Sequence, residues 1–238
     1  MSETKVKAIV LGGIDYKEKD KLISLFTLEQ GIVPVVFRGV KNVNAKLKSA
    51  KELFSFGDFI LHEGKVKTVI SADIIDSFFD LTKNIKKYYV ACAIIDVIKT
   101  VLLEGETNSE LFVNTLKSFK MLCYENVNYF NIINKFLITV FERFGYKFTL
   151  NFCNNCGAEI INNRFMNINY GDITCANCRI GNYIELSKPV YSAIRMLAIT
   201  NIDKISTIKI PTVLNEQVFE VLSLNFASRF NKKLIKIL

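Results

Sequence analysis

The feature that most constrains the fold is a set of four cysteines arranged as two Cys-x-x-Cys pairs. Cys153 and Cys156 form the first pair, Cys175 and Cys178 form the second, and 18 residues separate the pairs. A two-residue gap lets one tight turn point two thiolates at a single ion, with zinc–sulfur bonds of about 2.3 Å. A hairpin between the pairs brings the second pair round to complete a tetrahedron. The spacing therefore predicts one structural Zn²⁺ per chain, because four thiolates leave no open coordination position.

Disulfide and redox interpretations of the cysteines are weaker. The start of the chain is polar, and Asp96 and Lys99 interrupt its most apolar segment, residues 94–103. With neither a signal sequence nor a membrane span, we expect a cytoplasmic protein with reduced thiols. A thioredoxin-like site needs only one such pair. Cys92 and Cys123 stand singly in apolar helical patterns, and we interpret them as core residues.

Short strand-like segments fill the first eighty residues. They lie at residues 5–11, 22–27, 32–37, 54–61 and 66–75. Glycines and other turn residues separate these apolar or β-branched runs. Five strands in so short a length predict a small closed barrel of the OB-fold type, with an SH3-like barrel as the competing interpretation.

The apolar period becomes helical after residue 80. Helices are predicted over residues 83–103, from about 107 to 124, over 127–144, from 187 onward and over 211–230. Thr107 and Glu110 have the spacing of a capping box, and Gly145 suits the position just beyond a helix C-terminus. Ser187 precedes Pro189, which fits the first turn of a helix.

These patterns together predict an α+β chain with two domains. We expect an N-terminal five-stranded OB-fold barrel over residues 1–80. An α-helical domain over residues 81–238 would carry a four-cysteine, zinc ribbon-like insertion at about 150–183.

The sharpest local charge asymmetry follows the third predicted strand. Between residues 36 and 51 the chain has no acidic residue. The cations of this segment are Arg38, Lys41, Lys46, Lys48 and Lys51. The whole chain carries 31 Lys and Arg against 23 Asp and Glu, a net charge of +8. Because OB-folds bind single strands through a positive groove that follows the phosphates, we predict that these five residues contact nucleic acid.

A solvated Lys-rich loop is the plain alternative for the basic segment. The nearby Phe37, Phe54 and Phe56 are more typical of barrel core than of platforms for bases. A second acid-free stretch closes the chain, with cations at Arg229, Lys232, Lys233 and Lys236.

The residues for enzymatic catalysis are missing from the sequence. His62 is the only histidine, and no phosphate-binding Gly-rich loop is present. Asp73, Asp76 and Asp80 could suggest a metal cluster, but we interpret them as a solvated face because no further ligand motif accompanies them. We therefore predict a binding protein without catalytic residues.

With these residues in hand, the chain resembles the RecO family of bacterial recombination mediators. The segment VLGGIDYKEKDKLISLFTLEQG, residues 10–31, resembles the first hairpin of that family. FRGVKNVNAKLKSAKELFSFGDF resembles its basic segment, and the order of barrel, helical domain and four-cysteine insertion also agrees. One departure is Asn42, since the usual Lys-Gly-Ala-Arg-Arg run appears here as Arg-Gly-Val-Lys-Asn.

The resemblance implies a DNA repair protein of homologous recombination, in the bacterial cytoplasm and associated with the nucleoid. Such a protein binds single- and double-stranded DNA, anneals complementary strands and helps to load recombinase on covered single strands. The implied partners are RecR, the acidic C-terminal tail of single-strand-binding protein and, indirectly, RecA. The resemblance assigns DNA contact to Arg38 and Lys41, whereas charge alone adds Lys46, Lys48 and Lys51.

A zinc-ribbon regulator of transcription or an RNA-binding factor is the main alternative function. In that case the cysteine segment itself would touch nucleic acid. Its charge disfavours this, because Arg164 and Arg179 are its cations against Glu159, Asp172 and the nearby Glu185.

Overall fold

The computed structural model describes residues 3–42, 45–146, 151–161 and 163–237. The chain divides into two compact units, one of residues 1–91 and 98–123 and the other of residues 92–97 and 124–238. In chain order the first elements are β1 (Glu3–Tyr16), β2 (Asp20–Thr27), β3 (Gly31–Phe37), β4 (Phe56–His62), β5 (Lys67–Asp76), α1 (Ile85–Val101) and α2 (Ser109–Tyr124). They are followed by α3 (Tyr129–Arg143), β6 (Arg164–Asn167), β7 (Ile173–Thr174), β8 (Tyr183–Leu186), α4 (Lys188–Ile199) and α5 (Thr212–Phe230).

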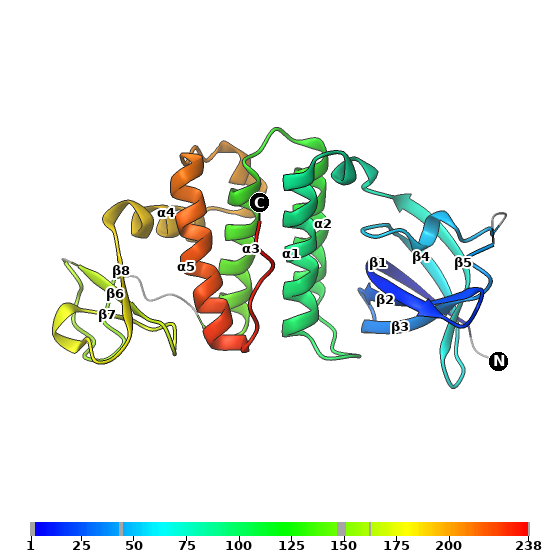
Figure 1. Ribbon diagram of the computed structural model, residues 1–238, viewed down its shortest axis with the longest axis horizontal. Helices are drawn as coiled ribbons and strands as arrows, with labels where there is room; N and C mark the ends of the chain where they lie inside the picture. The colour runs from blue at the N-terminus through cyan, green and yellow to red at the C-terminus, as the bar shows by residue number, and fades with distance from the viewer. Residues whose placement is uncertain (1–2, 43–44, 147–150, 162, 238) are drawn as a thin grey trace. The chain divides into compact units, whose positions relative to one another are not determined.

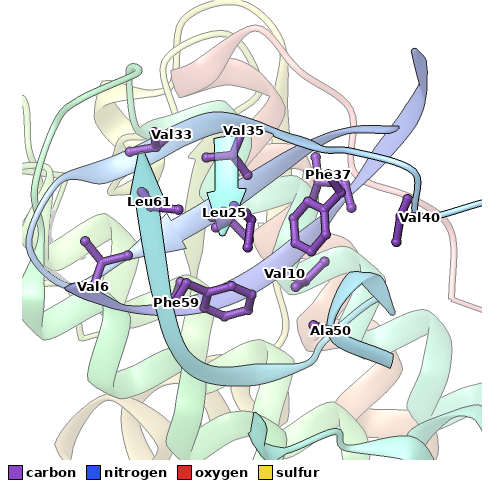
Figure 2. Packing of buried hydrophobic residues seen from close by; sticks show 13 residues of the cluster. Val6, Val10, Leu25, Val33, Val35, Phe37, Val40, Ala50, Phe59 and Leu61 are labelled. Atoms are coloured by element: carbon purple, nitrogen blue, oxygen red, sulfur yellow. The ribbon is translucent and has the colours of Figure 1, made fainter. Parts of the chain in front are cut away.

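The five N-terminal strands form a closed barrel, as the sequence predicts (Figure 1). Their order around it is β1-β2-β3-β5-β4. Antiparallel pairs join β1 to β2, β2 to β3, β1 to β4 and β4 to β5. A short parallel pairing of β3 with β5, at Val35 with Lys67 and Val36 with Thr68, closes it. Alternate residues of the strands, including Val6, Leu25 and Phe59, fill the interior (Figure 2).

Aromatic side chains cover one end of the barrel. Phe54 and Phe78 both lie edge-to-face against Phe119 of α2, at centroid distances of 5.4 and 5.7 Å. Phe112 of the same helix packs against Phe26 in the same manner, at 5.3 Å. Helix α2 therefore shares an apolar core with the barrel, although the two are separated in the sequence.

The second unit is built around α3, which is buried on almost every side. Its two buried asparagines form hydrogen bonds inside this core. Asn131 Nδ2 donates to the carbonyl of Ile208 at 3.0 Å, Asn134 Nδ2 donates to the carbonyl of Asn215 at 3.0 Å, and Asn215 Nδ2 donates to Asn131 Oδ1. Because buried amides are costly when unpaired, these bonds select one way of packing α3 against α5 and the residues before it.

Of two helix ends predicted from the sequence, one differs in the structure and one agrees. The capping box at Thr107 is wrong, because Asn108 Oδ1 accepts the hydrogen bond from the Leu111 backbone N–H at 3.0 Å, and α2 begins one residue later. Asn ranks at least as high as Thr among N-cap residues, so the neighbouring residue takes the cap. Gly145, at φ +80°, follows the end of α3 as predicted. Among the described residues, no helix is both long and apolar enough to cross a membrane.

Candidate nucleic-acid interface and metal centre

The basic segment between β3 and β4 is amphipathic. Val40 and Ala50 are almost fully buried and join the barrel core (Figure 2). Leu47 is partly buried and packs against the same core. Arg38, Lys46 and Lys48 alternate with these anchors and are exposed. The apolar residues therefore hold the segment on the barrel while the cations point to solvent, although residues 43–44 lie outside the described part of the chain.

Two of the five predicted DNA contacts are already engaged within the protein. Lys51 forms an ion pair with Glu52, and its side chain is only 17% exposed. Lys41 forms an ion pair with Asp15 at 3.2 Å. The hydrogen bond from Lys41 is the main reason why the pKa of the Asp15 carboxyl lies below its usual value. Arg38, Lys46 and Lys48 are thus the members of the set with the greatest freedom to meet a phosphate.

The phenylalanines near the basic segment are not available to nucleic acid. Phe37 and Phe54 are fully buried, and Phe56 is 9% exposed. An aromatic ring does lie beside exposed cations elsewhere on the barrel, at the end of β1. The Nζ of Lys17 stands 5.4 Å from the centroid of the Tyr16 ring. Sequence reasoning missed this pair because it searched for acid-free runs, and Asp15, Glu18 and Asp20 lie among the lysines of this turn.

The four cysteines gather at one point in the insertion. Their Sγ atoms all lie within 4.8 Å of one another, and Cys156 and Cys175 are separated by 4.0 Å. A tetrahedron with metal–sulfur bonds of about 2.3 Å has sulfur–sulfur edges of roughly 3.8 Å, so the four atoms fit around one ion. Asp73, Asp76 and Asp80 do not form such a group within the described part of the chain.

Backbone turns of the expected kind present the thiols. The N–H of Gly157 donates to the carbonyl of Cys153 at 2.9 Å, and the N–H of Cys178 donates to that of Cys175 at 3.2 Å. Gly157, at φ +71°, adopts the left-handed conformation that glycine accepts most easily. Each pair therefore lies in a tight turn that a backbone hydrogen bond closes.

The thiols do not share one acidity. Burial opposes ionisation of Cys153, but hydrogen bonds from the backbone of Cys175, Cys156 and Asn155 lower its pKa to about 6. The side chain of Asn155 favours ionisation of Cys178, yet hydrogen bonds to Cys156 and Cys175 outweigh it and raise the pKa of Cys178 to about 12. Four adjacent thiolates need a cation between them, and a divalent metal supplies that charge.

Helix α5 and a small core hold the insertion in place. Cys153 packs with Ile160, Met166, Ile173 and Leu186, and the strands β7, β6 and β8 pair in that order beside it (Figure 1). Asn225 Nδ2 donates to the carbonyl of Gly171 at 2.8 Å, and Arg229 pairs with Asp172 at 2.6 Å. Figure 1 shows this small sheet next to α4 and α5. These contacts dock the insertion, with its four-cysteine cluster, on α5.

Both arginines of the insertion cover aromatic rings. The guanidinium carbon of Arg164 lies 3.7 Å from the ring centroid of Tyr191, and that of Arg179 lies 4.7 Å from that of Phe165. Stacking of this kind stabilises the fold, and the ring covers one face of the guanidinium.

Comparison with known proteins decides the family. The family model described as recombination protein O, N terminal, matches residues 1–78, and the model for the C-terminal part matches residues 82–234. The chain belongs to the RecO family. A DNA repair protein RecO from Clostridium novyi (strain NT) is 28% identical over 98% of this chain and 91% of its own length. One from Caldicellulosiruptor saccharolyticus is 25% identical over 100% of this chain and 97% of its own length.

Membership in the family agrees with the fold. The five-stranded barrel, the helical region and the four-cysteine insertion occur in the order that the resemblance predicts. The chain is thus a DNA repair and recombination protein of the RecO family with a four-cysteine cluster suitable for a metal ion.

Proposed function

We propose that this chain binds single- and double-stranded DNA through its N-terminal barrel, anneals complementary strands and helps to load recombinase on covered single strands. The observation that carries the proposal is the match of both RecO family models along the chain. The outward-facing cations of the segment between β3 and β4 supply the chemistry, because ammonium and guanidinium groups neutralise phosphates and release counterions.

Arg38, Lys46 and Lys48 are the main phosphate contacts in this proposal. All three are exposed. Lys41 and Lys51 contribute less, because each already has a carboxylate partner, Asp15 and Glu52 respectively. A phosphate would have to displace that carboxylate before the cation gained a new ion pair.

The metal in the four-cysteine cluster is proposed to be Zn²⁺, one per chain. Zinc is the divalent ion most typical of closed tetrahedral Cys₄ sites. When bound, it supplies charge for the thiolates and a crosslink between the two turns, with no position free for a reactant. Cys153, Cys156, Cys175 and Cys178 would hold it, and its role is to keep the insertion folded.

The proposed protein partners are RecR, RecA acting indirectly, and the acidic C-terminal tail of single-strand-binding protein. A groove of about 750 Å³ between α5 and the last residues of the chain supports a peptide site. Phe219, Leu224 and Ile235 give it an apolar lining. Its charged groups are the cations Lys233 and Lys236 and the anions Glu216 and Glu220. The apolar lining suits the hydrophobic side chains of a short peptide, and the two lysines are the groups that would meet its carboxylates.

The decisive experiment is annealing of complementary oligonucleotides coated with single-strand-binding protein. We expect wild type to accelerate annealing and Arg38→Glu with Lys48→Glu to reduce it at least tenfold, with a shallower dependence of DNA affinity on salt. Lys204→Glu with Lys209→Glu makes the same charge change at two exposed positions of the second unit, and serves as the matched control. Absence of annealing by folded wild type would contradict the proposal.

The alternative function is a zinc-ribbon nucleic-acid-binding regulator. The charge of the insertion disfavours it, because Glu159, Asp172 and the nearby Glu185 oppose its two arginines. Of these arginines, Arg164 already donates a hydrogen bond to the carbonyl of Ile160. Affinities for single-stranded DNA, duplex DNA and RNA of equal length separate the two functions. Binding that survives Arg38→Glu with Lys48→Glu but is lost in Arg179→Gln would favour the ribbon.

A further inference from the structure

The tip of the β1–β2 hairpin is fixed against the start of the basic segment. Residues 17–19 join the two strands. The backbone N–H of Gly39 donates to Asp20 Oδ1 at 2.8 Å, and the backbone N–H of Lys41 donates to the carbonyl of Lys19 at 3.2 Å. Two segments that are separate in the sequence therefore form one continuous surface at this end of the barrel.

Lys41 connects the basic segment to the hairpin through its side chain. Its Nζ lies 3.2 Å from Asp15 Oδ2 and donates to the carbonyl of Lys17 at 3.3 Å. Lys21 approaches the other oxygen of Asp15 at 3.5 Å. The ammonium of Lys41 thus binds Asp15 of β1 and the carbonyl of Lys17 in the turn. Its charge is therefore paired within the protein.

The cations at the tip remain exposed. Lys17 and Lys19 both face solvent, as does Arg38 across the contact between the two segments. Of the three acids in residues 15–20, Asp15 and Asp20 are used in the contacts just described, which leaves Glu18. The surface is consequently positive where the hairpin and the basic segment meet.

An aromatic ring completes the arrangement. Tyr16 is the last residue of β1 and is half-buried, and the ammonium of Lys17 stands 5.4 Å from its ring centroid. Lys17 has φ +55°, a left-handed conformation that fixes the direction of the turn. Single-strand sites combine a positive track for the phosphates with rings on which bases stack, and the loop between the first two strands is a common place for them in OB-folds.

We infer that the β1–β2 hairpin tip forms the second side of the DNA site, with Lys17 and Lys19 on phosphates and Tyr16 stacked on a base, and that Lys41 is a positioning residue. The inference rests on the proposed DNA binding and deepens it, because it assigns residues outside the basic segment and gives the site an aromatic contact. Single-stranded DNA is the ligand, since only unpaired bases expose their faces for stacking.

The first test removes the two charges without disturbing the turn. Lys17→Asn suits φ +55°, because Asn tolerates the left-handed region better than most residues, and Lys19→Gln preserves length. We expect the slope of log affinity against log salt to become shallower by about 0.7 for each cation lost. The matched control, Lys204→Gln with Lys209→Gln, keeps the wild-type slope.

The second test uses fluorescence. The chain has no tryptophan, so Tyr16→Trp introduces a single reporter. Stacking of a base on the new indole ring quenches its emission when oligo(dT) is added. Tyr170→Trp, at a position in the insertion that is 65% exposed, is the control and stays unquenched. In the Tyr16→Trp background, Lys41→Met weakens the quenching at saturating DNA, and Lys41→Arg restores it.

The outcomes separate this inference from the proposed function. If wild type binds DNA but the Lys17 and Lys19 variant keeps the full salt slope and the emission of the Tyr16→Trp variant stays constant, the hairpin tip is not part of the site and only the inference fails. If folded wild type binds no DNA, both fail. A shallower slope together with quenching supports both.

Discussion

The packing of α2 on the barrel leads to a specific prediction for Phe119→Ala. Phe119 is fully buried and lies edge-to-face between Phe54 and Phe78, at centroid distances of 5.4 and 5.7 Å. Removing a buried phenylalanine ring lowers the free energy of unfolding by about 3–5 kcal/mol, because the side chains around the cavity lose their contacts with the ring. Because a domain has only about 5–15 kcal/mol of stability, this is a large share of the total.

The measurement is hydrogen exchange of full-length protein, followed by mass spectrometry or NMR. If α2 and the barrel unfold together, the amides of β2 and β4 lose protection in Phe119→Ala by roughly a hundred- to a few-thousand-fold, the factor that corresponds to about 3–5 kcal/mol. Val113→Ala removes an apolar group from the same helix at a residue that is 45% exposed, and we expect a change within about 0.5 kcal/mol.

The result that would refute this reasoning is loss of protection in α2 alone. Unchanged protection in β2 and β4 would mean that the barrel is stable without its helical neighbour. A domain boundary near residue 80, which the sequence predicts and which remains a prediction, would then also be a boundary of cooperative unfolding. Loss of protection in both places would join residues 98–123 to the barrel in solution, as they are joined in its compact unit.

Three further predictions concern charged and metal-binding groups. Lys41→Met raises the pKa of the Asp15 carboxyl, because the hydrogen bond that chiefly lowers it is lost. In wild type this ion pair stabilises the fold above the ordinary Asp pKa, and the stabilisation disappears as the pH falls through the lowered pKa. An NMR titration that finds the same Asp15 pKa in both proteins would disprove the pairing. Burial lowers the pKa of Lys135 from 10.5, so the unfolded chain binds more protons than the native one just below that pH, and stability rises as the pH approaches 10.5. Lys135→Met removes this part of the pH dependence. If the urea midpoint changed by the same amount between pH 8 and pH 10 in the variant and in wild type, the prediction would be contradicted. Wild type purified without chelator contains about one equivalent of zinc by elemental analysis. Cys175→Ser contains far less, and the backbone amides of its insertion exchange hydrogen faster. Zinc well below one equivalent in wild type would refute the assignment.

Local patterns in the chain were sufficient to predict several parts of the molecule. The two Cys-x-x-Cys pairs specify their own turns, and the structure brings the four sulfurs together. Alternating apolar residues specify the strands of the barrel, because a strand with one buried face has a period of two. The acid-free composition of the basic segment predicted its exposed cations, whereas the structure added that Val40 and Ala50 turn inward between them.

Tertiary structure alone decided which charged groups are free. Lys41 and Lys48 look alike in the sequence, but Asp15 comes within 3.2 Å of Lys41 only because β1 and β2 place the hairpin tip beside the basic segment. Tyr16 gains its place beside that surface by the same contact. Phe119 likewise meets Phe54 from a distant part of the chain. The physical reason is common to all of them: periodicity and spacing determine which face of an element is apolar, whereas the partner of each exposed group depends on contacts between residues that are remote in the sequence.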